Sequence, residues 1–450
     1  MGDVGDRLIY SGNICKNTFY YAYRFISLLQ DNIDRLGDDM PEENLDASSR
    51  LGREMINAAH YLIENAFFDD LRKLAKALGK EYVATDLLVR RIIERDFLAM
   101  GFSPYKMNLD RFTIIATLKE MPKDEAEFRK LVETLPYNPW LRYAGIQAIP
   151  RKTFILTYLL PAESDVEKIE EKIRSHPAID KEKGVEGYKL EYTFYTKPIH
   201  FKEWFRKGII MTMTGAKNMI QDILERKIAL ELREFVGRRE DPLDVEDIVL
   251  MSVLEYRYVV TPAWVYRIRG PAKLGISTVK YHFKRHIKNR YYLGIYLKRP
   301  PNPEVLDTVA VIIAEGRGVE YLAYKLSRTP YASAFCNYDK HICSIQFFCR
   351  EQDLSFIDKL LGSQGISIDK VMITFKRNEP PRYHYRRTLS LATYAINAKK
   401  WYKLDQALKY GHLAEARIIK KYIKTNRVPR ENIYIYTPKE DTEAEPTEQI

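Results

Sequence analysis

The sequence is poor in cysteine and histidine and has no long apolar run. Only 4 of its 450 residues are cysteine and 8 are histidine, so cysteines are too few for a disulfide framework. No apolar run approaches the roughly 18 residues that span a bilayer. The first residues, MGDVGDRLIY, lack the basic and apolar regions of a signal peptide. We therefore expect a soluble, cytoplasmic protein.

The familiar catalytic motifs are also missing. The sequence contains no P-loop, no dinucleotide-binding fingerprint, no G-x-S-x-G elbow and no zincin motif. Cys336, Cys343 and Cys349 fall on predicted strands without a C-x-x-C pattern, which favours structural core cysteines over a metal site. We therefore expect no enzymatic activity, no cofactor and no bound metal.

Acidic residues are absent from one long segment. Between Glu255 and Glu304, 48 residues contain no Asp or Glu but carry eleven Lys and Arg, which equals the net charge of +11 for the whole chain. The last fourteen residues, TPKEDTEAEPTEQI, are acidic and predict a disordered tail. Such a concentration of positive charge indicates an acidic partner.

Hydrophobic periodicity predicts two copies of one structural plan. Three helices, at 53–67, 69–79 and 83–100, suggest a helix-turn-helix domain. Alternating strands and helices over 111–196 then follow the order βαββαβ. The same plan recurs in the second half of the chain. Three helices are predicted there, at 244–259, in PAWVYRIRG and in TVKYHFKRHIKNRYYLG, and Ser277 caps the last of them. A second βαββαβ segment follows over 305–375.

The predicted fold class is α+β: tandem winged helix-turn-helix domains, each followed by a ferredoxin-like βαββαβ domain, plus extra helices. The expected domains are an N-terminal helical extension (1–45), a first helix-turn-helix domain (46–108), a first ferredoxin-like domain (109–199), a helical linker (200–240), a second helix-turn-helix domain (241–303), a second ferredoxin-like domain (304–380), a basic helical region (381–436) and the acidic tail (437–450).

The segment 277–299 contains the candidate binding residues. On a helix, Val279, Phe283 and Ile287 form one apolar stripe, and cations lie on the other side. Residues 291–299 suit a β-wing. The predicted DNA contacts are Ser277, Thr278, Lys280, Tyr281, Lys284, Arg285, Lys288, Arg290, Lys298 and Arg299.

Two other interpretations of this segment stay open. Most charge runs are solvated faces, and this helix can be one. His282 and His286 also have the spacing of an H-x-x-x-H metal pair, but the sequence near them offers no third ligand, and nearby cations oppose a dication.

The stretch LGISTVKYHFKRHIKNRYYLGIY resembles the recognition-helix segment of the leucine-responsive regulatory protein (Lrp/AsnC) family, and residues 305–375 resemble its regulatory domain. The resemblance implies binding to double-stranded DNA, pairing of the ferredoxin-like domains and an amino-acid effector, with an archaeal source. Two units in one chain imply an intramolecular pseudo-dimer or a larger homo-oligomer. Cys336 or Asn337 replaces the family's glycine, which departs from the effector-binding pattern.

The expected function is therefore a sequence-specific DNA-binding transcriptional regulator that uses mainly the second helix-turn-helix. In the first unit, Arg90, Arg91 and Arg95 are balanced by Asp86, Glu94 and Asp96, so that helix is locally neutral. The alternative is a protein-interaction subunit associated with transcription machinery, which binds nucleic acid nonspecifically. Mobility-shift experiments separate the two, because only a regulator prefers a defined sequence.

Overall fold

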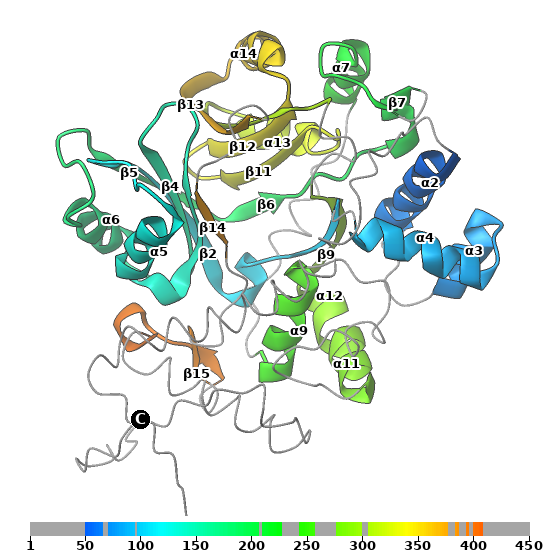
Figure 1. Cartoon of the computed structure of the whole chain (residues 1–450), viewed down its shortest axis with the longest axis horizontal. Coiled ribbons are helices and arrows are strands. Elements are labelled where there is room, and N and C mark those ends of the chain that lie inside the picture. Colours follow the sequence, from blue (N-terminus) through cyan, green and yellow to red (C-terminus); the bar gives the residue numbers. More distant parts are fainter. Residues whose placement is uncertain are drawn as a thin grey trace, which may run out of the picture.

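The computed structural model describes residues 50–65, 71–94, 97–206, 209–226, 243–256, 276–298, 305–376, 383–386, 393–395 and 399–407. Helices and antiparallel sheets share these residues, so the predicted α+β class is confirmed. Two five-stranded sheets stand beside each other, and two groups of helices lie at their margin (Figure 1). Within the described ranges, no helix combines the length and apolar character needed to cross a bilayer.

The first group of helices comprises α2 (Arg50–Asn65), α3 (Leu71–Leu78) and α4 (Tyr82–Glu94). In α2, Met55, Ala59 and Leu62 recur at helical spacing and are buried, which explains why this helix docks on one face. The predicted continuation of the third helix to residue 100 is wrong. Strand β1 (Leu98–Phe102) begins there instead, and all five of its residues are buried.

The first sheet has the strand order β14-β3-β4-β2-β5. Its elements are β2 (Leu109–Thr117), α5 (Glu125–Thr134), β3 (Leu141–Ile146), β4 (Thr153–Pro161), α6 (Val166–Arg174) and β5 (Val185–Leu190). The predicted element order over 111–190 is present. Asp165 caps α6, because its side chain accepts a hydrogen bond from the amide of Lys168.

The second sheet has the order β13-β10-β12-β11-β6. Its elements are β10 (Thr308–Glu315), α13 (Val319–Leu326), β11 (Ala332–Asn337), β12 (Ile342–Cys349), α14 (Leu354–Ser363) and β13 (Ser367–Lys376). These follow the expected plan closely. The fifth strand, β6 (Tyr192–Phe194), comes from the first half of the chain and pairs with β11, so the end of the predicted first βαββαβ segment, 111–196, divides between two sheets.

The two halves of the chain also meet through β1 and β9. Strand β9 (Tyr292–Leu297) pairs antiparallel with β1, with Ala99 opposite Tyr296. The expected β-wing at 291–299 is therefore wrong, since these residues close a buried two-stranded ladder. Gly101 makes this packing possible, because a Cβ atom there would lie 2.6 Å from the ring of Tyr195.

The second group of helices comprises α9 (Val245–Tyr256), α11 (Ile276–His282), a π-helical segment (Phe283–Ile287) and α12 (Lys288–Arg290). The predicted apolar stripe is confirmed for Phe283 and Ile287, which are fully buried. Ser277 lies inside α11 and is not its cap. The predicted helix PAWVYRIRG falls outside the described residues.

The regions between and after the repeats differ from the predicted long helices. Residues 200–226 contain short elements: a 3-10 turn (Phe201–Trp204), β7 (Phe205–Arg206), β8 (Ile209–Ile210) and α7 (Lys217–Glu225). Near the C-terminus, the described residues include three short strands, β14 (His384–Arg386), β15 (Tyr394–Ala395) and β16 (Lys400–Trp401), and a helical turn at 404–407. The rest of the predicted helical region lies outside the described residues. Strand β14 extends the first sheet by pairing with β3. The predicted N-terminal helical extension (1–45) and the acidic tail (437–450) lie outside the described residues.

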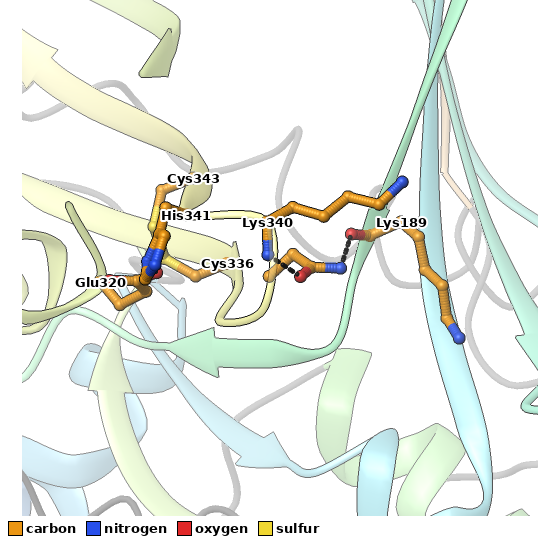
Figure 2. Close-up of a disulfide and its surroundings, with 7 residues drawn as sticks. Lys189, Glu320, Cys336, Lys340, His341 and Cys343 are labelled. Atoms are coloured by element: carbon orange, nitrogen blue, oxygen red, sulfur yellow. Dashed lines mark hydrogen bonds and ion pairs between the residues drawn. A yellow bond between two sulfur atoms is a disulfide. The ribbon is translucent and has the colours of Figure 1, made fainter. Parts of the chain in front are cut away.

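The cysteines of the second sheet behave partly as expected. Cys349 is buried and free, as core cysteines often are. Cys336 and Cys343 instead form a disulfide across β11 and β12 (Figure 2), which the sequence did not predict. Beside it, the Asn337 side chain donates to the Lys189 carbonyl (3.1 Å) and accepts from the Lys340 amide (2.9 Å), so the turn after β11 is tied to β5.

Candidate anion-binding site

Arg111 is a half-buried cation on the first sheet whose Nε atom is fully buried. It lies on β2, between Leu159 of β4 and Leu190 of β5. Its guanidinium carbon stands 3.7 Å from the centre of the Phe335 ring on β11, so the second sheet supplies an aromatic face for the charge. Burial, aided by the positive charge of nearby Arg142, lowers the pKa of Arg111 to about 10, although Tyr195 and Glu255 act in the opposite direction.

Arg142 approaches the same region from β3. It is the extra residue of a β-bulge, because Leu141 pairs with Tyr158 while Tyr143 pairs with Thr157. Bulges redirect a side chain out of the regular alternation of a strand. The redirected guanidinium reaches Glu255 on α9, with Nη2 and Oε2 2.5 Å apart and both side chains largely buried.

The charges in this region do not balance. Two guanidinium groups face one carboxylate, Glu255. Within the described part of the chain, Arg111 Nε and Arg142 Nη1 are buried and have no hydrogen-bond partner. Buried donors without acceptors, and a buried cation without a counter-charge, are both energetically unfavourable. The region can therefore accept an anion.

Two tyrosines border the arginines. Tyr195 and Tyr296 stack with ring centres 4.2 Å apart, and their planes are inclined by 21°. The Tyr195 hydroxyl donates to the Phe102 carbonyl at 3.2 Å. Burial raises the pKa of Tyr195, with Tyr296 and Glu255 adding to the effect. The Tyr195 phenol therefore stays neutral near pH 7 and does not cancel the positive charge of the arginines.

A cavity of about 320 Å³ lies elsewhere, between β2, β5 and β13. Its charged lining includes Lys183, Glu186 and Lys370, and Glu186 is paired with Lys370 at 2.9 Å. Lys183 is exposed to solvent, so it needs no protein partner. This cavity therefore lacks the buried, uncompensated charge found around Arg111.

Most of the predicted DNA-contact residues lie on α11, the π-helical segment and α12, and their contact with DNA stays a prediction. Ser277, Lys280, Tyr281, Lys284, Arg285 and Lys288 are exposed, Thr278, Arg290 and Lys298 are half-buried, and Arg299 is outside the described residues. None of them lies among the residues that surround Arg111. The opposite side of this helix packs on α9, where His282 and His286 face Asp247.

No family model and no curated protein matches this sequence. Among solved structures, the siroheme decarboxylase NirDL matches with a TM-score of 0.42 and 9% identity, covering 84% of this chain and 100% of that chain. NirDL in complex with an iron-uroporphyrin III analogue matches with a TM-score of 0.40, 9% identity and coverage of 84% and 99%. The protein PH0061 matches 32% of this chain and 91% of its own length, with a TM-score of 0.23 and 16% identity.

These comparisons contradict the expected function. We expected a non-enzymatic DNA-binding regulator or interaction subunit, but the structures that match most of this chain are those of an enzyme. The error has a physical source. Outward-facing cations on an amphipathic helix occur both on DNA-binding surfaces and on ordinary solvated surfaces, and the pattern alone does not separate them.

Proposed function

We propose that this chain is an enzyme that acts on a carboxylate-bearing substrate, and that Arg111 and Arg142 hold a carboxylate of that substrate. One observation carries the proposal: of two neighbouring arginines, only Arg142 is paired with a protein carboxylate, and each guanidinium retains one buried N–H group without a partner in the described part of the chain. A substrate carboxylate supplies the missing negative charge and the missing acceptors.

The geometry suits a carboxylate because its two oxygens can accept from two guanidinium groups at once. Glu255 holds Arg142 in place, and the Phe335 ring supports Arg111. Both arginines are fixed by strands of one rigid sheet, so little ordering is needed when the substrate binds. In this arrangement Arg111 and Arg142 bind and orient the anion, and Glu255 positions Arg142.

The architecture belongs to the same proposal. We propose that the two sheets are ferredoxin-like units in a covalent pseudo-dimer of Lrp-like design. Numbered within each unit, the strand order is 2-3-1-4 in the first sheet and 4-1-3-2 in the second, which is one order read from opposite edges. Pairing of β1 with β9 and of β6 with β11 joins the halves.

The first assay should use siroheme, because it is the substrate named for the similar solved enzymes. Siroheme would be added to purified full-length protein under anaerobic conditions, with binding followed by its absorbance and carboxyl loss by mass spectrometry. We expect binding in the wild type and at least a roughly 30-fold weaker Kd in Arg111→Met, since truncating one partner of a buried charged pair costs about 2–5 kcal/mol.

The matched control is Arg206→Met, which removes an exposed arginine on β7. This variant should bind siroheme like the wild type. Citrate at constant ionic strength tests simple carboxylates in the same way, by protection against thermal unfolding. If neither siroheme nor citrate binds, or if Arg111→Met binds as tightly as Arg206→Met, the proposed role of the arginine pair is wrong.

A further inference from the structure

Helix α9 carries a second cluster of ionisable side chains at its N-terminus, away from the arginines. The cluster consists of Asp244, Asp247, His282 and His286, and one possible ligand atom from each lies within 4.8 Å of all the others. The two acids flank the start of α9, and the two histidines project from the helix that packs against it. The two aspartates and the two histidines, which lie about 35 positions apart in the sequence, are thus brought together at the start of α9.

Asp247 is at the centre of this cluster. Its Oδ1 lies 2.8 Å from His282 Nδ1, and its Oδ2 lies 3.1 Å from His286 Nδ1. The amide of Asp244 donates to the same Oδ2 at 3.0 Å. The Asp247 side chain is only 2% exposed, so the carboxylate is held in a defined position by groups from both helices.

Asp244 completes the set on the solvent side. Its Oδ2 is 3.4 Å from His286 Nδ1, while its Oδ1 accepts from Lys399 Nζ at 2.9 Å. One oxygen therefore faces the imidazole and the other is held by an ammonium group. Outer partners of this kind orient metal-binding carboxylates in many proteins.

The distances resemble those between ligands around one metal ion. With metal–nitrogen and metal–oxygen bonds near 2.0–2.1 Å, the ligands of a tetrahedral site lie about 3.3 Å from each other. The Asp–His separations of 3.1 and 3.4 Å are close to this value, and 2.8 Å requires only a small outward shift. Two imidazoles and two carboxylates are ligands that first-row transition metals accept, Zn²⁺ among them.

We propose that Asp244, Asp247, His282 and His286 bind one divalent first-row transition-metal ion, such as Zn²⁺. The inference does not depend on the proposed carboxylate substrate. The ion would link the start of α9 to the helix formed by α11 and its π-helical continuation. A π-helical segment is uncommon and often occurs at functional sites, and this one contains His286.

An ion can reach the cluster from solvent. The side chains of His286 and Asp244 are 21% and 29% exposed. Tyr281 lies at the rim, with its ring edge-on to both imidazoles at centroid distances of 5.4 and 5.3 Å. The site is thus walled by protein on the Asp247 side and open on the Asp244 side.

The surrounding cations do not prevent binding. Lys280 and Lys284 lie two residues before and after His282, which places them roughly 160–200° around the helix from its side chain. Both are exposed to solvent, where their charges are screened. Lys399 contacts Asp244 Oδ1, the oxygen that faces away from the histidines. The two carboxylates together with Lys399 carry a net negative charge, which favours a cation at the cluster.

The test uses tag-free full-length protein that has been treated with EDTA and dialysed. Zn²⁺ is titrated against a competing chromophoric chelator, and Co²⁺ is titrated separately while visible absorption is recorded. We expect one ion per chain, together with the d–d bands of Co²⁺ bound by nitrogen and oxygen. A strong thiolate charge-transfer band would instead place the ion on a cysteine and overturn the proposal.

The decisive variant is His282→Asn combined with His286→Asn. An asparagine amide can still donate to Asp247 in place of Nδ1–H, so the contact between helices is kept while two metal ligands are lost. We expect the Zn²⁺ affinity to fall at least about 100-fold, more than the loss typical of an outer-shell change.

The matched control is His60→Asn, which removes a His–carboxylate pair (3.2 Å from Glu64) on α2. It should bind Zn²⁺ like the wild type. Equal affinity in the cluster variant and the control, or no stoichiometric binding by the wild type, shows that the Asp–His contacts only join two helices. If the cluster variant does not fold, the single variant His286→Asn, which keeps the buried contact between Asp247 and His282, is titrated in its place and should also bind Zn²⁺ more weakly than the wild type.

Discussion

The two ends of helix α9 contact opposite kinds of charge. At its start, Asp244 and Asp247 face two histidines, so negative charge is in excess. Near its end, Glu255 faces Arg142 and lies close to Arg111, so positive charge is in excess. Asp247 and Glu255 are eight residues apart, which corresponds to about 12 Å along the helix. One helix thus separates a region suited to a cation from a region suited to an anion.

The comparison shows how a surplus of charge indicates a ligand. In an ion pair such as Lys370 with Glu186, the two charges cancel, so the pair gives no indication of a ligand. An excess of one charge in a buried region destabilises the folded protein when no ligand is bound. A ligand of the opposite charge removes this cost when it binds. The predictions below test each end of α9 through the stability of the protein without ligand, starting with the largest expected effect.

Removing Arg142 should produce the largest change. Arg142→Met leaves Glu255 without its direct partner and should lower the free energy of unfolding by about 3 kcal/mol or more. Adding Glu255→Met to the same chain should restore much of that loss, since no lone carboxylate then remains. Urea denaturation of the two single variants and the double variant measures the coupling; purely additive effects would contradict the pairing.

At the other end of α9, the two aspartates should differ. Asp247→Ala removes the acceptor for two imidazoles and one amide, and should cost about 3 kcal/mol. Asp244→Ala alters a half-exposed group and should cost about 1 kcal/mol. Thermal melts of both variants in EDTA provide the comparison, and similar losses would mean that Asp247 is not the central residue of the cluster.

Substitution of Arg111 should stabilise the ligand-free protein, whereas the preceding substitutions destabilise it. Because its cation is buried without a direct counter-charge, Arg111→Met should raise the free energy of unfolding by roughly 2 kcal/mol in the absence of ligand. A gain in stability with a loss of carboxylate binding is the trade-off expected of a binding residue. Destabilisation in ligand-free urea melts would instead assign Arg111 a structural role.

The exposed cations of α11 and α12 should matter least. Lys280→Glu with Lys288→Glu changes two solvated side chains and should shift the free energy of unfolding by no more than about 0.5 kcal/mol. Siroheme and Zn²⁺ titrations of this variant should match the wild type within about twofold. A large change in either titration would show that this surface contributes to the carboxylate site or to the metal site.

Much of the element order could be predicted from local patterns. The strands and helices of both βαββαβ segments lie within a few residues of their expected positions, because each alternates or repeats with the period of its structure. The failures fall where a segment depends on a distant partner. Residues 98–102 form a strand because β9 pairs with them, and β14 forms because β3 offers an edge.

The candidate sites were less accessible to sequence reasoning. Arg111 and Arg142 stand in strands that are otherwise rich in apolar residues, RFTIIATL and WLRYAGI, and a charged residue in such a strand was the available signal. The predicted binding site was instead based on the many Lys and Arg residues of the segment 280–299. His282 and His286 were noticed as a possible metal pair, but the lack of a third ligand nearby argued against them.

The sequence by itself determined the α+β class, the repeated order of elements and the amphipathic character of the helix around Phe283 and Ile287, because these follow from local periodicity. Tertiary structure alone decided which charges meet. Glu255 reaches Arg142 across 113 positions, and Asp247 reaches His282 across 35. Electrostatic balance depends on distance in space, so neither the surplus of positive charge nor the Asp–His cluster could be read from the order of residues.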